Sequence, residues 1–144
     1  TSYCAGGVNS TGHVADLSLL GSAHLIDDDV ELRVDGLPPR SVGVFLSSRF
    51  AGQIANPGAG VGQFCVRRDV GRFRAPGQVR MADPLGRVVL DAAASEWSNS
   101  ALPAALGVYS ASVGDRTHFQ FWYRDRIQGT AVTVLSDGEY LDWR

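Results

Sequence analysis

Apolar and charged residues alternate without a break along residues 29–35, and this alternation constrains the fold more than any other feature of the chain. In the segment Asp-Val-Glu-Leu-Arg-Val-Asp every second side chain is aliphatic and the others are charged. Successive side chains of a β-strand point to opposite faces of a sheet. The segment therefore predicts a strand with one face in a core and the other in water.

The most aromatic segment, residues 117–124, predicts a strand with rings on both sides. Its side chains divide between two faces, with Phe119, Phe121 and Tyr123 on one and His118, Gln120 and Trp122 on the other. A strand this aromatic is typical of one that supplies the core and also packs between sheets.

Further segments with extended character are separated by turn signals. They are residues 14–20, 42–48, 64–73, 78–82, 87–91, 130–135 and 140–143. The turn Asp83-Pro84-Leu85-Gly86 predicts that 78–82 and 87–91 form a hairpin. Residues 51–63 are expected to be a loop, and 92–106 is the one stretch that fits a helical turn, limited by Pro103. About eight or nine short strands predict an all-β fold, an antiparallel β-sandwich of jelly-roll or Ig-like type.

The length and composition are those of one domain. The chain has 144 residues, 44% of them hydrophobic, so residues 1–144 are expected to close around a single core. No apolar run approaches the ~20 residues of a membrane helix, which predicts no membrane span. The net charge of −2 argues against a nucleic-acid partner. The chain begins at Thr1 without a signal segment, as expected of a mature secreted product or of a module from a longer chain.

Two cysteines, Cys4 and Cys65, are present without the C-x-x-C spacing of a redox or zinc site. They are either two inert thiols or one disulfide. The disulfide is favoured because other features of the chain indicate export, and disulfides persist outside the cell. Closing a loop of this length would stabilise the fold by about 4 kcal/mol.

Several short motifs occur in a fixed order: YCAG at 3–6, NSTG at 9–12, GLPP at 36–39, QFCV at 63–66, HFQFWYRD at 118–125 and LSDG at 135–138. With them the chain resembles an uncharacterised secreted domain of planctomycete and myxobacteria-type bacteria, typically the C-terminal part of large extracellular proteins. The resemblance spans nearly the whole chain, and FQFWYRD is its most specific element. It implies an exported, disulfide-closed, β-rich module without an assigned catalytic residue. After Asp125 the chain departs from the family's Pro/Gly-rich turn, with Arg-Ile-Gln-Gly at 126–129.

The sequence has no motif of a catalytic or cofactor site. It lacks a nucleophile elbow, an H-E-x-x-H pair, a phosphate loop and a dinucleotide fingerprint. The three histidines, His13, His24 and His118, lie far apart in sequence. The chain is therefore expected not to be an enzyme and to need no cofactor.

Charge is unevenly distributed along the chain. Residues 1–36 have a net charge of −5, residues 37–90 of +6 and residues 91–144 of −3. The plain interpretation of the basic part is a charged sheet edge that resists aggregation. The sharper interpretation is an interface with another copy or with a neighbouring extracellular protein, since complementary charges orient partners. Its expected residues are Arg67, Arg68, Arg72 and Arg74 on one side and Asp27, Asp28 and Asp29 on the other.

The same acidic run has oxygen ligands of the kind that Ca²⁺ prefers. Its spacing is not that of an EF-hand loop, so a solvated turn between two strands is the plainer interpretation. If calcium binds here, Asp27 and Asp29 are the expected ligands.

Aromatic side chains suggest a different role, the binding of polysaccharide. The candidates are Trp97, Tyr109, Trp122 and Trp143. Trp97 is expected to be the most exposed because it lies in the polar stretch SEWSNS, whereas core packing is the stronger interpretation of Trp122. The predicted glycan site is therefore Trp97 with Tyr109. Separately, Asn9-Ser10-Thr11 matches the N-glycosylation pattern and makes Asn9 a candidate acceptor, although so short a pattern also arises by chance.

The sequence thus predicts a non-catalytic extracellular or cell-surface module. Its first predicted role is structural, self-association into a filament or surface layer, because head-to-tail contacts that do not close make fibres. The alternative is a glycan-binding module of a larger secreted protein.

Overall fold

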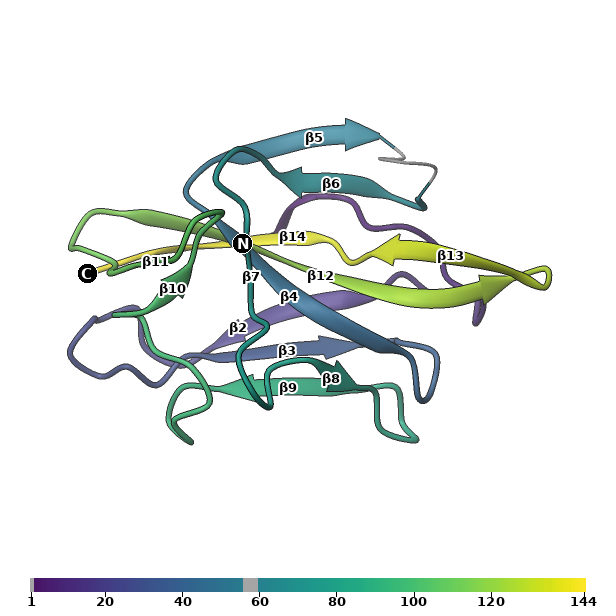
Figure 1. Ribbon diagram of the computed structural model, residues 1–144, viewed down its shortest axis with the longest axis horizontal. Coiled ribbons are helices and arrows are strands. Elements are labelled where there is room, and N and C mark those ends of the chain that lie inside the picture. The colour runs from purple at the N-terminus through teal and green to yellow at the C-terminus, as the bar shows by residue number, and fades with distance from the viewer. Residues whose placement is uncertain (1, 56–59) are drawn as a thin grey trace.

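The computed structural model describes residues 2–55 and 60–144, and this part of the chain is built from β-strands alone (Figure 1). It contains fourteen strands and no helix, so none of it is a helix that could cross a membrane. The predicted all-β, antiparallel sandwich is confirmed. More strands are present than expected because strands also form at residues 2–4, 51–55, 102–103 and 108–109, and because the segment predicted at 64–73 is divided into two.

The strands follow one another in this order: β1 (Ser2–Cys4), β2 (Asp16–Leu20), β3 (Glu31–Asp35), β4 (Val42–Ser48), β5 (Ala51–Ala55), β6 (Gln63–Val66), β7 (Gly71–Arg72), β8 (Arg80–Met81), β9 (Val88–Asp91), β10 (Leu102–Pro103), β11 (Val108–Tyr109), β12 (Arg116–Ile127), β13 (Thr130–Leu135) and β14 (Gly138–Asp142).

The larger sheet is built around β12, which is twelve residues long, and has the order β1-β14-β12-β4-β7. β4 pairs along one edge of β12, while β14 and then β13 pair along the other. β8 pairs with Val42 and Gly43 at the start of β4, whereas β7 pairs with Leu46 and Ser47 farther along the same strand. Residues directly opposite in a ladder face the same side, so Phe45 lies beside Phe121 and Val44 beside Trp122.

A smaller sheet, β2-β3-β9, packs on one face of the larger one. The alternation of residues 29–35 places Leu32 and Val34 of β3 in the core, as predicted. Phe45, Phe119 and Phe121 of the larger sheet belong to the same buried cluster. In Figure 1 the smaller sheet lies below β12 and the β5–β6 hairpin above it. The core lies between the two sheets.

The turn at residues 83–86 forms, but the hairpin predicted around it is wrong. The N–H of Gly86 donates to the carbonyl of Asp83 and closes the turn. β8 then pairs with β4 of the larger sheet, whereas β9 pairs with β3 of the smaller one. Val88 and Leu90 alternate into the core, and burying them on β3 outweighs pairing with the exposed β8. The turn is therefore a corner between the sheets.

The loop predicted for residues 51–63 is wrong at both ends. β5 and β6 pair there, while residues 56–59 lie outside the described part. The small residues of β5 carry no hydrophobic alternation, so nothing in its sequence indicated a strand. Its partner β6 is fixed by the bond between Cys65 and Cys4, which provides an edge for β5 to pair with.

The extended segment predicted at 64–73 is broken by a bend between β6 and β7. Arg68 and Asp69 have φ angles of 53° and 45°, in the left-handed region that non-glycine residues rarely adopt. The buried Ser48 hydroxyl lies 2.8 Å from the carbonyls of Arg67 and Arg68 and holds the bend from β4.

The helical turn expected within residues 92–106 is absent. Pro103 lies instead in the short strand β10, and Ser95 has a φ of 60° that a helix does not allow. Trp97 and Leu102 both reach the core from this stretch, and the irregular backbone lets them do so.

β12 and β13 are joined by a two-residue turn. Gln128 and Gly129 have φ angles of 51° and 77°, and Ile127 pairs with Thr130. Positive φ at both central residues is what a type I′ hairpin turn requires. The two strands therefore form a tight hairpin.

Candidate functional site

The candidate site lies on the outer face of β12, the face turned away from the core. As predicted, Phe119, Phe121 and Tyr123 point into the core. The intervening side chains form a row on the outer face: His118, Gln120, Trp122 and Arg124. One half of this row is covered by other parts of the chain, and the other half is open.

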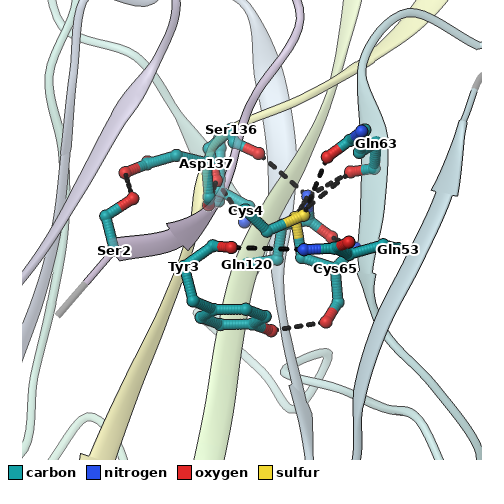
Figure 2. Close-up of a disulfide and its surroundings, with 10 residues drawn as sticks. Ser2, Tyr3, Cys4, Gln53, Gln63, Cys65, Gln120, Ser136 and Asp137 are labelled. Atoms are coloured by element: carbon teal, nitrogen blue, oxygen red, sulfur yellow. Dashed lines mark hydrogen bonds between the residues drawn. A yellow bond between two sulfur atoms is a disulfide. The ribbon is translucent and has the colours of Figure 1, made fainter.

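The covered half lies under β1 and the β5–β6 hairpin, which a disulfide joins. Cys4 of β1 is bonded to Cys65 of β6, which confirms the pairing favoured from the sequence. Figure 2 shows this disulfide beside Gln120, with the Tyr3 hydroxyl donating a hydrogen bond to the carbonyl of Cys65. The disulfide therefore joins β1 to the β5–β6 hairpin, and these segments together form a cover over this half of the outer face.

Gln120 binds the cover to the sheet. Its Oε1 accepts a hydrogen bond from the N–H of Cys65 at 2.9 Å. Its Nε2 donates to the carbonyls of Gln63 at 2.7 Å and Ser136 at 2.8 Å (Figure 2). Both amide hydrogens are thereby used, so this fully buried side chain is structural rather than ligand-binding.

His118 is buried in the same half, between the rings of Tyr3 and Tyr140. The ring centroids lie 5.1 Å and 6.0 Å from that of the imidazole. Burial, together with the nearby charge of Arg116, lowers the pKa of His118. Its Nδ1 has no hydrogen-bond partner in the part of the chain that the structure describes, so nothing there activates it as a base.

The open half is centred on Trp122. The indole is half-buried and borders two adjoining depressions of about 340 Å³ and 320 Å³. The guanidinium of Arg72 lies over the ring, 5.0 Å from its centroid. Arg72 also borders a groove of about 900 Å³. Arg72 thus borders three hollows, and Trp122 borders two of them.

Arg72 reaches Trp122 because of the local sequence around β7. In Arg72-Phe73-Arg74 the charged side chains face outward, while Phe73 packs in the core against Phe45. The preceding Gly71 crosses β10 closely, since a Cβ there would lie 2.1 Å from the carbonyl carbon of Pro103. A glycine at this crossing therefore allows β7 to lie against β4 with Arg72 beside Trp122 of β12.

The depression on the β8 side of Trp122 is positively charged. Arg72, Arg74 and Arg124 border it, and its walls are otherwise mainly apolar. Among the described residues none of the three arginines has a carboxylate within 4.0 Å. The open half therefore combines an aromatic ring with uncompensated positive charge in a shallow groove.

The structure divides the four arginines that were predicted to form one interface. Arg72 and Arg74 lie by Trp122, whereas Arg67 and Arg68 lie at the bend after β6, beside Arg49 and Phe50. Other arginines of the basic segment form ion pairs within the chain: Arg80 with Glu96 at 2.7 Å, Arg87 with Asp35 at 2.6 Å and Arg49 with Asp69 at 3.4 Å. The fold thus neutralises part of the charge segregation seen along the sequence.

The acidic run at 27–29 serves mainly to hold loops. Asp28 accepts hydrogen bonds from the Ser98 hydroxyl at 2.5 Å and the Asn99 N–H at 2.8 Å. Asp29 accepts one from the N–H of Ser22 at 2.8 Å, while Asp27 is exposed. The described residues contain no group of three histidine, cysteine or acidic side chains that could hold a metal. Among the described residues, the fold therefore places no third carboxylate where it would complete a calcium site with Asp27 and Asp29.

The expectation that Trp97 is exposed is wrong. Only 6% of Trp97 is exposed, because its ring packs against Phe73 and Phe119. Its Nε1 donates to the carbonyl of Leu90 at 3.3 Å. The polar neighbours Ser98 and Asn99 do not keep it in water, because they hydrogen-bond Asp28 instead. Such a ring has no free face for a sugar.

Tyr109, the second residue of the predicted glycan site, lies apart from Trp97. Its ring is half-buried under the guanidinium of Arg49, at 4.9 Å from the centroid. Its hydroxyl lies 3.3 Å from the Thr117 Oγ1. No ring contact joins Trp97 and Tyr109 within residues 2–55 and 60–144, so the structure does not bring the predicted pair together.

The structure places Asn9, the candidate glycan acceptor, in a buried turn. Asn9 is 4% exposed, and its Nδ2 donates to the Gly36 carbonyl at 2.8 Å and the Tyr123 hydroxyl at 3.2 Å. Its Oδ1 accepts from the N–H and the hydroxyl of Thr11, the geometry of an Asx turn. In this fold the N-S-T motif is a structural turn, because both hydrogens of the amide are already used.

Trp122 is the candidate that sequence reasoning assigned to the core instead of to a site. One signal was present: the alternation places Trp122 opposite the apolar face of its strand, next to Arg124. The second half of the site, Arg72, is distant in sequence and reaches Trp122 only through the pairing of β7 with β4.

Comparison with protein-family models, with curated proteins and with solved structures finds no match for this chain. The resemblance to a secreted bacterial domain therefore stays a prediction, and function is inferred from the geometry of the outer face.

Proposed function

We propose that the chain is a non-catalytic extracellular module that binds polysaccharide on the open half of the outer face of β12. The observation that carries the proposal is the Trp122–Arg72 pair, which borders two adjoining hollows. An indole at the floor of a shallow groove offers a flat apolar surface to the C–H face of a sugar. Arginine N–H groups beside it supply donors for sugar oxygens.

Two further observations support this proposal. The Cys4–Cys65 disulfide is compatible with an extracellular protein, because such bonds persist in oxidising compartments. The buried His118, with no partner at Nδ1 among the described residues, favours a binding role over catalysis. The site proposed here replaces Trp97 and Tyr109, since Trp97 has no free ring face.

Affinity electrophoresis tests the proposal. The wild-type chain and the variants Trp122→Ala and Tyr109→Ala are run in native gels containing one polysaccharide each. We expect at least one polysaccharide to retard the wild type and the Tyr109→Ala variant, but not Trp122→Ala. Retardation of Trp122→Ala equal to that of the wild type would contradict the site. Thermal unfolding of each variant verifies that it is folded.

Self-association is a second candidate, favoured by the patch at the β6–β7 bend. Arg67 and Arg68 are exposed there, beside Phe50, which is 44% exposed. Neither arginine has an acidic partner within the described residues, and the exposed Asp27 of another copy has the complementary charge. Pairs of this kind are weak and screened by salt.

Light scattering at low ionic strength tests this second candidate. Large particles for the wild type and monomers for Arg67→Gln/Arg68→Gln would support it. A 15.4 kDa monomer for the wild type would contradict it.

A further inference from the structure

We infer that the polysaccharide held beside Trp122 is acidic, a chain of sugars that carry carboxylate groups; this inference rests on the proposed function. The hollow on the β8 side of Trp122 is bordered by Arg72, Arg74 and Arg124. A neutral sugar would not need three cations in one depression of about 320 Å³. The carboxylate of a uronic acid would compensate the charge of these arginines.

The positive charge continues beyond this hollow. Arg124 and Val42 also border a neighbouring hollow of about 580 Å³, which is lined as well by Arg40 and Arg126. We call the five arginines of the two hollows the arginine track: Arg72, Arg74, Arg124, Arg126 and Arg40. A continuous row of this kind fits a linear polymer with a charge on successive units better than a single small anion.

The one acid in the second hollow is already engaged. The Asp125 carboxylate accepts hydrogen bonds from the N–H and the hydroxyl of Ser10, both at 2.7 Å, and from the N–H of Arg126 at 2.7 Å. It therefore fixes the start of the β12–β13 hairpin and forms no ion pair with an arginine of the track among the described residues.

Arginine is suited to carboxylates because its planar guanidinium donates two parallel hydrogen bonds to the two oxygens. The guanidinium carbon of Arg72 lies 5.0 Å from the centroid of the Trp122 ring, and no carboxylate among the described residues forms an ion pair with this arginine. A sugar ring packed on the indole, with its carboxylate bound to Arg74 or Arg124, would contact both the aromatic and the charged side chains of the hollow. No ion pair within the described residues has to break first.

A nucleic acid is the other polyanion that an aromatic ring and arginines could bind. The chain has a net charge of −2, whereas nucleic-acid-binding domains are usually basic overall. Within the part of the chain that the structure describes, Trp122 is the one aromatic residue that borders both depressions, while Phe64 borders the first and the buried Tyr123 the second. These observations favour the acidic polysaccharide, and single-stranded DNA becomes a control in the test.

The test uses polygalacturonate and its carboxyl-reduced, neutral form as matched probes. Binding is measured by calorimetry for the wild type, for Arg74→Gln/Arg124→Gln and for the control Arg67→Gln/Arg68→Gln. The control removes the same charge from the bend, away from the track. We expect the wild type to prefer polygalacturonate, and the track variant to bind it about tenfold more weakly or worse, since each lost charged hydrogen bond costs at least that factor. The control is expected to stay within about twofold, because screened charges outside a site contribute little.

Each other outcome overturns the inference in a distinguishable way. Equal binding of the reduced polymer, lost in Trp122→Ala, would leave the polysaccharide site standing and refute its preference for acidic sugars. Equal losses in the track variant and the control would show attraction to the overall charge alone. Tighter binding of single-stranded DNA than of polygalacturonate would replace the polysaccharide by a nucleic acid. Polygalacturonate binding that Trp122→Ala leaves unchanged would refute the proposed function itself.

Discussion

His118 and Gln120 lie on the same face of β12 as Trp122 and Arg124, yet the first two are buried and the other two border open hollows. The alternation of the strand is the same in both halves. They differ in what lies near them: a disulfide-bonded cover over the first half, and Arg72 of β7 together with Arg74 beside the second. A sheet face is therefore made structural or available for binding by the segments that cross it.

The cover is fixed at several points, which explains why one half of the face is closed. Besides the disulfide and Gln120, the Asp137 carboxylate accepts hydrogen bonds from the Ser2 hydroxyl at 3.0 Å and the Leu17 N–H at 2.7 Å. Burial raises the pKa of Asp137 although these bonds oppose it. β1 and β2 are thereby joined to the residue that precedes β14. The open half has no comparable set of buried bonds among the described residues.

The largest expected effect breaks the cover at its disulfide. The variant Cys4→Ser/Cys65→Ser is expected to have a free energy of unfolding about 4 kcal/mol lower than the wild type, because the loop between the cysteines is no longer closed in the unfolded chain. Urea denaturation followed by circular dichroism measures it. The wild type with a reductant serves as a second sample and should behave like the variant. A loss below about 1 kcal/mol, well under the usual range, would show that the cover is held without the disulfide.

A somewhat smaller effect is expected from Gln120→Leu. The change leaves the N–H of Cys65 and the carbonyls of Gln63 and Ser136 buried without their partner. Each unsatisfied group costs about 1–3 kcal/mol, so we expect the free energy of unfolding to fall by about 3 kcal/mol. The matched control on the same face, Arg124→Gln, should stay within about 0.5 kcal/mol. Equal effects of the two variants would remove the distinction between the halves.

The pH dependence of the free energy of unfolding tests the burial of the His118 imidazole in the covered half. Since burial lowers the pKa of His118 in the folded state, the unfolded chain binds its proton more readily. The contribution of His118 to stability is therefore lost as the pH falls below about 6.5, the ordinary pKa of histidine. His118→Phe keeps a ring between Tyr3 and Tyr140 but does not titrate.

We expect the difference in unfolding free energy between His118→Phe and the wild type to grow in favour of the variant as the pH falls from 7 to 5. Taking the difference cancels the contributions of Asp137 and Glu139, whose pKa values burial raises and whose share of stability decreases as the pH rises. A difference that is constant with pH would contradict the burial of His118 as a neutral group.

The smallest expected effect on stability lies in the open half. Arg72→Gln removes the guanidinium from the Trp122 ring, a contact that contributes about 0.5–1 kcal/mol at an exposed site. Thermal unfolding should therefore shift only slightly, while binding of a retained polysaccharide weakens. Arg67→Gln, outside the hollows at Trp122, controls for the lost charge. A loss as large as that of Gln120→Leu would make Arg72 part of the structural half.

The local pattern of the sequence was enough to predict the strands with regular alternation and their faces, but not β1, β5, β10 or β11. The alternation at 29–35 matches the observed burial, and the odd–even division of 117–124 matches the two faces of β12, because a strand's two faces follow from its own residues. The partners of each strand depend on distant residues. Val88 and Leu90 pair with Val34 and Leu32 of β3 within the smaller sheet, and no local turn signal shows this.

The candidate site was harder to predict, for the same reason. Polar neighbours suggested that Trp97 is exposed, but exposure depends on what packs over a ring, and Phe73 and Phe119 come from elsewhere in the chain. The arginines of residues 67–74 lie close together in the sequence. A bend at Arg68 and Asp69 then separates Arg67 from Arg72, and the sequence does not show this left-handed backbone.

The open, positively charged surroundings of Trp122 are tested most directly by fluorescence quenching with ions of opposite sign. The chain has three tryptophans, and the other two, Trp97 and Trp143, are 6% and 2% exposed. Iodide should quench the wild type more strongly than caesium does, because Arg72 and Arg74 attract the anion, and Trp122→Phe should lose that iodide-accessible emission. Emission in Trp122→Phe that iodide still quenches as in the wild type, or equal quenching of the wild type by both ions, would contradict the account.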